Sequence, residues 1–176
     1  VAQTHHYDSS PNATNMVWGW GDMSRWAAAT FDRPYLIGEY GYQGEDSYPN
    51  PAGLPLARLH HHAMWAPVMH GGAAGSAMLW RVNYSFLPPP DFRANARRFS
   101  AWLASELPFL RAMDSVWDGE GLPGYWAGGF RKPDRAALYF LSKAAHWDID
   151  DSALAPVSGA SYALTGLPAG DYQVDL

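Results

Sequence analysis

The sequence has no cysteine, no lysine- or arginine-rich run and no long apolar run. The lack of cysteine among 176 residues excludes disulfides and thiolate metal sites, and it leaves both a secreted and a cytoplasmic origin open. A formal net charge of −5 without clustered positive charge argues against a nucleic acid or an anionic membrane as partner. The apolar runs are also shorter than the roughly 20 residues that a membrane-spanning helix needs. The expected partner is therefore a neutral or small molecule.

Aromatic residues, in contrast, are abundant. The chain has nine Trp, ten Tyr and seven Phe, more than the core of so short a chain ordinarily requires. Large aromatic side chains fill cores, but their faces also stack on the apolar faces of sugar rings. Burial is the first expectation for any single aromatic residue. The surplus nevertheless predicts that some of them face a ligand or solvent.

The first 108 residues alternate between strand-like and helix-like patterns. Continuous apolar stretches typical of buried parallel strands alternate with amphipathic stretches at helical spacing. The predicted strands are residues 1–5, 35–40 and 73–80, and the predicted helices are residues 22–29, with Asp22 as N-cap, 54–70 and 91–107. Such alternation predicts parallel strands with right-handed crossovers, and hence an α/β sheet or barrel over residues 1–108.

The pattern changes after Pro108. Residues 119–129 are rich in turn formers, residues 136–142 are typical of a strand, and residues 161–176 alternate around a Pro-Ala-Gly turn. We therefore expect a second, β-rich accessory domain with a β-sandwich character over residues 109–176.

Glu39 is the strongest candidate for chemistry. It lies at the carboxyl end of the apolar stretch that begins at Tyr35, where an ionisable side chain is costly unless it is paired or used. Glycosidases use such carboxylates as nucleophiles. A structural ion pair with Arg33 or Arg81 explains the same residue equally well, so the strand alone leaves both interpretations open.

Three motifs together resemble a known family. Residues 33–41, Arg-Pro-Tyr-Leu-Ile-Gly-Glu-Tyr-Gly, resemble the seventh-strand motif of glycoside hydrolase family 5 and its cellulase-like relatives. His5-His6-Tyr7 resembles the sixth-strand His-x-Tyr motif, and residues 77–80 resemble the eighth strand, which ends in a tryptophan. The motifs follow the family's order over about the first hundred residues. The resemblance implies the C-terminal part of a (β/α)8 TIM barrel, strands six to eight.

The resemblance also implies roles for individual residues. Glu39 corresponds to the nucleophile, Tyr7 to a hydrogen-bond donor to it, His5 to a contact near the reacting sugar and Trp80 to a stacking platform. Asn83, just after the eighth strand, is a further candidate for binding sugar hydroxyl groups. The two-residue spacing of His5 and Tyr7 places both side chains on the same side of a strand.

The activity that this resemblance implies is retaining hydrolysis of a β-linked oligo- or polysaccharide, without cofactor or metal. A retaining mechanism needs a second carboxyl group, which in the family lies in an Asn-Glu pair after the fourth strand. No Asn-Glu pair occurs in this sequence. A chain or segment that carries strands one to five is therefore an expected partner. A non-catalytic carbohydrate-binding module and a purely structural α/β piece remain alternatives, which binding of sugar without turnover, or no response to sugar, would distinguish.

Three consecutive histidines, His60 to His62, invite a metal interpretation that the geometry disfavours. Neighbouring residues on a helix diverge by about 100° and so cannot share one ion. No cysteine or paired carboxylate completes a ligand set. The sequence therefore predicts no metal site at this cluster.

Overall fold

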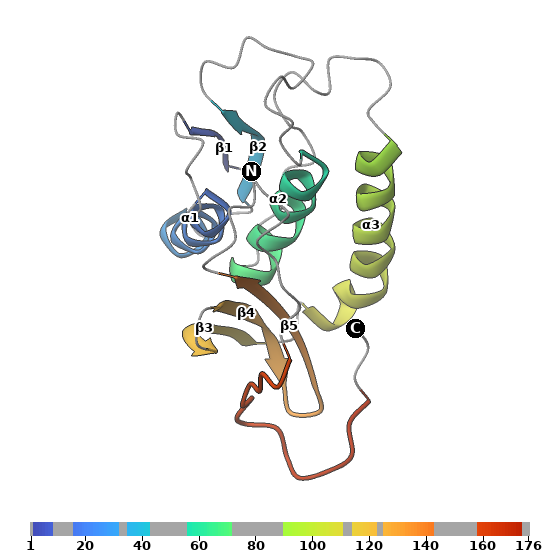
Figure 1. Ribbon diagram of the computed structural model, residues 1–176. Coiled ribbons are helices and arrows are strands. Elements are labelled where there is room, and N and C mark those ends of the chain that lie inside the picture. The colour runs from blue at the N-terminus through green and yellow to red at the C-terminus, as the bar shows by residue number, and fades with distance from the viewer. Residues whose placement is uncertain are drawn as a thin grey trace.

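The computed structural model describes residues 2–8, 16–31, 35–42, 56–71, 90–110, 114–122, 125–142 and 158–173. The elements form two groups around a central helix (Figure 1). A parallel strand pair with its connecting helix lies on one side, and a three-stranded antiparallel sheet lies on another. Within the described part of the chain, no helix has the length and apolar character needed to cross a membrane.

The first group is a strand-helix-strand unit. Strand β1 (Ala2–Asp8) and strand β2 (Tyr35–Tyr42) pair in parallel, and helix α1 (Met16–Phe31) connects them. This is the order of elements that the sequence predicts for the segment. Helix α1 packs on one face of the pair, where the ring centroids of Trp20 and Tyr40 are 5.0 Å apart.

The predicted start of α1 was wrong. Asp22 was expected to cap the helix, but the helix begins six residues earlier, at Met16, and runs through Gly19 and Gly21. Glycine weakens a helix interior by about 1 kcal/mol relative to alanine. Burial of Trp20, which is completely inaccessible to solvent, offsets that cost. Asp22 instead forms an ion pair with Arg25, three residues further along the helix.

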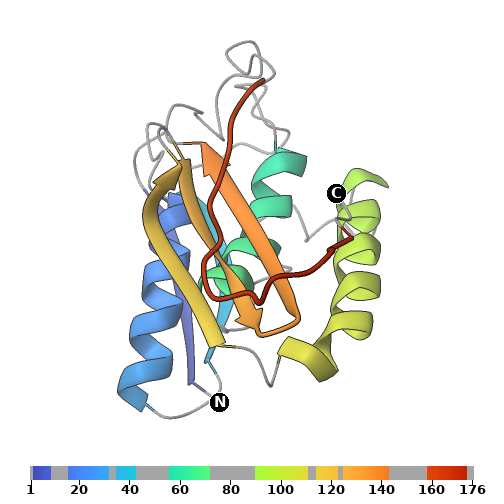
Figure 2. The ribbon, with the colours of Figure 1, turned by 90° about the horizontal axis from the view of Figure 1, so that it is seen from below.

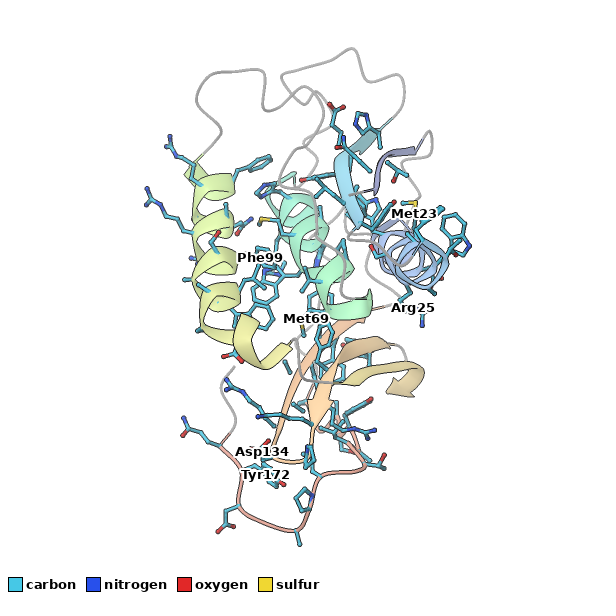
Figure 3. All side chains as sticks on the ribbon, turned by 180° about the vertical axis from the view of Figure 1, so that it is seen from behind. Met23, Arg25, Met69, Phe99, Asp134 and Tyr172 are labelled. Atoms are coloured by element: carbon cyan, nitrogen blue, oxygen red, sulfur yellow. The ribbon has the colours of Figure 1, made fainter. Side chains whose placement is uncertain are left out.

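Helix α2 (Leu56–Gly71) is the central element. It contacts α1, α3 (Pro90–Leu110) and all three strands of the antiparallel sheet (Figure 1). Met69 on α2 and Phe99 on α3 lie in the region between these helices and the sheet (Figure 3). The shared core consists of Val68, Met69 and Phe130, with Trp65, Phe99, Trp102, Leu103, Ala137 and Tyr139 packed around it.

The antiparallel sheet follows the order β3 (Asp114–Leu122), β4 (Tyr125–Lys132) and β5 (Arg135–Ser142). The strand expected over residues 136–142 corresponds to β5. Residues 119–129, expected as turns, lie mostly in β3 and β4. At Gly129 the backbones of β4 and β5 lie too close together for a side chain. A Cβ atom at this position would lie 3.0 Å from the carbonyl carbon of Ala137.

Residues 158–173 form no strand, so the expected pair of alternating strands was wrong for the described part of that segment. Gly166, at a φ of 85°, adopts a left-handed conformation near the end of the first expected strand. The segment passes across the antiparallel sheet (Figure 2). Arg131 donates a hydrogen bond to the carbonyl oxygen of Thr165, and the rings of Phe140 and Tyr162 are 5.0 Å apart. Side chains of the sheet therefore hold this segment.

The expected boundary between residues 108 and 109 falls within α3, which ends at Leu110. An ion pair of 2.6 Å between Glu106 on α3 and Arg135 on β5 crosses that boundary. Met69 and Phe130 also pack together across it. The segments before and after residue 108 therefore share one core.

Candidate active site

His5 and Glu39 lie side by side on the parallel strands. The strand register pairs the two residues directly. The Nδ1 atom of His5 is 3.5 Å from the Oε2 atom of Glu39. The side chain of Glu39 is 17% exposed and that of His5 is 42% exposed, so the pair is open to solvent on the imidazole side. A carboxylate is thus held beside a solvent-accessible imidazole.

A one-residue shift in strand register orients Glu39. Thr4 pairs with Ile37 but His5 pairs with Glu39, so Gly38 is the additional residue, as in a β-bulge. Because side chains alternate along a strand, a regular β2 would place Glu39 on the same face as Tyr35 and Ile37. The shift moves the carboxylate to the opposite face.

Burial along β2 shows the same change of phase. Tyr35 and Ile37 are two residues apart and buried, but the next buried side chain is Tyr40, three residues further on. Tyr40 packs against Trp20 of α1, and burial raises the pKa of its hydroxyl group well above the ordinary value. The side chains that β2 directs toward the helix, Tyr35, Ile37 and Tyr40, are therefore buried and uncharged, and Glu39 lies on the other side.

Thr4 identifies the same two faces from β1. Its hydroxyl group contacts the Sδ atom of Met23 on α1 at 3.9 Å and hydrogen-bonds the hydroxyl group of Tyr35. Figure 3 shows Met23 on the side of α1 that is near the strands. His5, the next residue, projects to the face away from α1.

Gln3 continues the polar row on that face. Its Nε2 atom is 3.0 Å from the Nε2 atom of His5. This arrangement requires a glycine at position 38 of the neighbouring strand β2. A Cβ atom on Gly38 would lie 2.6 Å from the Cδ atom of Gln3 and closer still to its amide nitrogen. Gln3, His5 and Glu39 thus form a continuous row of polar side chains.

The structure places the other predicted site residues only in part. Tyr7 lies on β1, where its backbone pairs with Gly41. Trp80 and Asn83 lie outside the described residues, as does the predicted strand of residues 73–80. Arg33 and Arg81, the partners in the structural ion-pair interpretation, also lie outside them. His5 is a described neighbour of the Glu39 carboxylate.

The three histidines of α2 have different neighbours. His60 stacks on Phe92 of α3 at 4.4 Å, His61 packs beside Trp65, and His62 hydrogen-bonds the hydroxyl group of Tyr139 on β5. The rings of His61 and His62 also make an edge contact, with centroids 5.1 Å apart. Among the side chains that the structure describes, no group of three or more His, Asp or Glu residues could hold a metal ion.

His61 makes stability depend on pH. Burial lowers its pKa from the ordinary 6.5, and the positive charge of Arg98 on α3 lowers it further. At His61 the folded state then binds fewer protons than the unfolded state. The contribution of His61 to the free energy of unfolding is therefore fully present above pH 6.5 and is lost as the pH falls below that value. We expect the free energy of unfolding to decrease between pH 7.5 and 5 in urea titrations.

A matched pair of variants separates this effect from other titrating groups. His61→Gln is expected to flatten the profile, and Arg98→Gln to reduce its slope because only burial then opposes protonation. A slope that His61→Gln leaves unchanged would assign the pH dependence to other residues.

Sequence reasoning missed Gln3 and the register shift. A detectable signal was present for the shift, because the apolar positions of β2 change phase between Ile37 and Tyr40 at a glycine.

Comparisons with protein-family models, curated proteins and solved structures found no match to this chain.

Proposed function

We propose that the chain is part of a retaining glycoside hydrolase that acts on a β-linked oligo- or polysaccharide, with Glu39 as nucleophile. The observation that carries the proposal is the placement of Glu39, which the register shift turns away from α1 and sets 3.5 Å from His5. The resemblance of residues 33–41 to a nucleophile motif supports the same role.

The chemistry follows a double displacement. A Glu39 oxygen attacks the anomeric carbon and forms a glycosyl ester while the bond to the leaving oxygen breaks. A carboxylic acid protonates that oxygen, and the resulting carboxylate then takes a proton from the water that hydrolyses the ester. His5 holds the Glu39 carboxylate in position, and no metal or cofactor takes part. Tyr7, Trp80 and Asn83 are proposed to contact the sugar.

The acid/base group is proposed to come from a segment or chain with the preceding strands of the barrel. Three described carboxylates are engaged on other elements. Asp22 pairs with Arg25 on α1, Glu106 pairs with Arg135, and Asp134 pairs with Lys132. None of these pairs involves β1 or β2.

The test is covalent labelling with 2-fluoro-β-glycosides that carry a dinitrophenolate leaving group. This group departs without protonation, so labelling reports the nucleophile even where the acid/base is absent. Intact mass is measured on the chain alone and with any co-purifying partner, and peptide mapping locates the label. A glycosyl adduct on Glu39, absent in Glu39→Gln, is the expected result.

The absence of an adduct in both preparations, across glucoside, mannoside, xyloside and cellobioside probes, would reject the proposal. Calorimetric titration with the matching oligosaccharides then distinguishes the alternatives. Binding without labelling would identify a carbohydrate-binding module, and no response would leave a structural role.

A further inference from the structure

We propose that Gln3 is a positioning residue that fixes His5 in the tautomer protonated at Nδ1 and so directs this proton toward Glu39. The assignment of the tautomer rests on the contacts of the imidazole ring, and its catalytic purpose rests on the proposed function of Glu39.

The hydrogen-bonding roles of the groups define the tautomer. The Nε2 atom of a glutamine amide is a donor only, so the His5 Nε2 atom at 3.0 Å must accept. A neutral imidazole that accepts at Nε2 carries its proton at Nδ1. That nitrogen is the one that lies 3.5 Å from the Glu39 Oε2 atom. The amide of Gln3 thus determines that the ring proton lies on the nitrogen that faces the Glu39 carboxylate.

Gly38 maintains this arrangement from the opposite strand. The side chain of Gln3 occupies the space where any larger residue at position 38 would place its Cβ atom. The atoms it would meet are the end of a flexible side chain, so Gly38→Ala is expected to displace Gln3 rather than to disrupt the strand pair. The glycine of the register shift therefore serves two purposes: it turns Glu39 to this face and leaves room for Gln3.

The arrangement has a consequence for the chemistry of Glu39. An Nδ1–H group stabilises the carboxylate and restricts its rotation, whereas an unprotonated Nδ1 would present a lone pair to it and repel it. A fixed carboxylate favours attack on the anomeric carbon, because the reacting atoms must approach to about 3 Å in one orientation.

The test is long-range ¹H–¹⁵N NMR on the full chain with ¹⁵N-labelled histidine, which reads the protonation of each ring nitrogen directly. We expect the neutral form of His5 to carry its proton mainly at Nδ1. Gln3→Met, which removes the donor at similar length, should lower the ratio of the Nδ1–H to the Nε2–H form about five- to tenfold, the value of one hydrogen bond. Gln3→Glu replaces the donor by an acceptor and should return a proton to Nε2.

Two further variants act as controls. Gly38→Ala should lower the ratio as Gln3→Met does, and the double variant should be no different from either single variant, because both remove one contact. Thr4→Val, on the opposite face of β1, should leave the His5 signals unchanged.

The proposal would be overturned if wild-type His5 were mainly in the Nε2–H form, or if Gln3→Met left the ratio unchanged. The NMR measurement needs no substrate, so it stands whether or not Glu39 becomes labelled. If Glu39 is labelled, Gln3→Met is expected to slow labelling and to change its pH profile, which a merely structural loss would not do.

Discussion

Replacement of Glu39 by alanine is expected to lower turnover of a β-linked substrate by roughly 10⁴-fold or more, on the order of the loss when an enzyme's covalent nucleophile is removed. The variant should fold normally, because the carboxylate lies on the partly exposed face and not in the core. The measurement is the initial rate with a dinitrophenyl glycoside, in the presence of any partner that co-purifies with the chain.

A small anion provides the decisive control. Azide or formate fits the space left by the Glu39 carboxylate and attacks the anomeric carbon from the same side. The expected product is a glycosyl azide of inverted configuration, with activity restored in proportion to the anion concentration. If Glu39→Ala keeps most of its activity, or if azide restores none, another group is the nucleophile.

Replacement of Trp20 by alanine is expected to have the largest effect on stability. Its ring is completely buried between α1 and β2 and makes an edge contact with Tyr40 at 5.0 Å. Removal of such a ring leaves a cavity and costs about 3–5 kcal/mol, a large part of the roughly 5–15 kcal/mol that stabilise a typical domain. Urea unfolding followed by circular dichroism gives the free energy directly.

The same helix offers a matched control. Trp26 is 58% exposed and contacts Phe31 near the end of α1, with ring centroids 5.3 Å apart. Trp26→Ala removes the same atoms from a solvated site, so we expect a loss below about 1 kcal/mol. Equal losses for Trp20→Ala and Trp26→Ala would contradict the described packing of α1 on the strands.

Strand β2 and helices α2 and α3 were predictable because each has a strong local pattern. The apolar residues of β2 and the amphipathic spacing of α2 and α3 are visible in the sequence. The start of α1 was not, because two glycines near Trp20 argue locally against a helix, and tertiary burial overrides them. Residues 158–173 show the reverse case, in which local alternation predicts strands but Gly166 and contacts with the antiparallel sheet prevent a strand.

Two residues of the candidate site, Glu39 and His5, could be chosen from the sequence, but their relative geometry could not. Glu39 and His5 stand out by residue type and position, but a sequence does not state which residue of one strand opposes which residue of another. That pairing decides whether Glu39 faces α1 or the opposite side of the strand pair. Gln3 has no distinguishing motif, and its interest follows only from its distance to His5 and from the space beside Gly38.

The central position of α2 has a consequence for the order in which the protein forms during synthesis. Val68 and Met69 are made long before Phe130, the residue of β4 that completes their cluster. Until β4 and β5 leave the ribosome, one side of α2 has no cover, and exposed apolar surface of this kind binds chaperones or associates with other nascent chains. The core can therefore close only late in translation, and the β1–α1–β2 unit, whose contacts are local, is expected to form first.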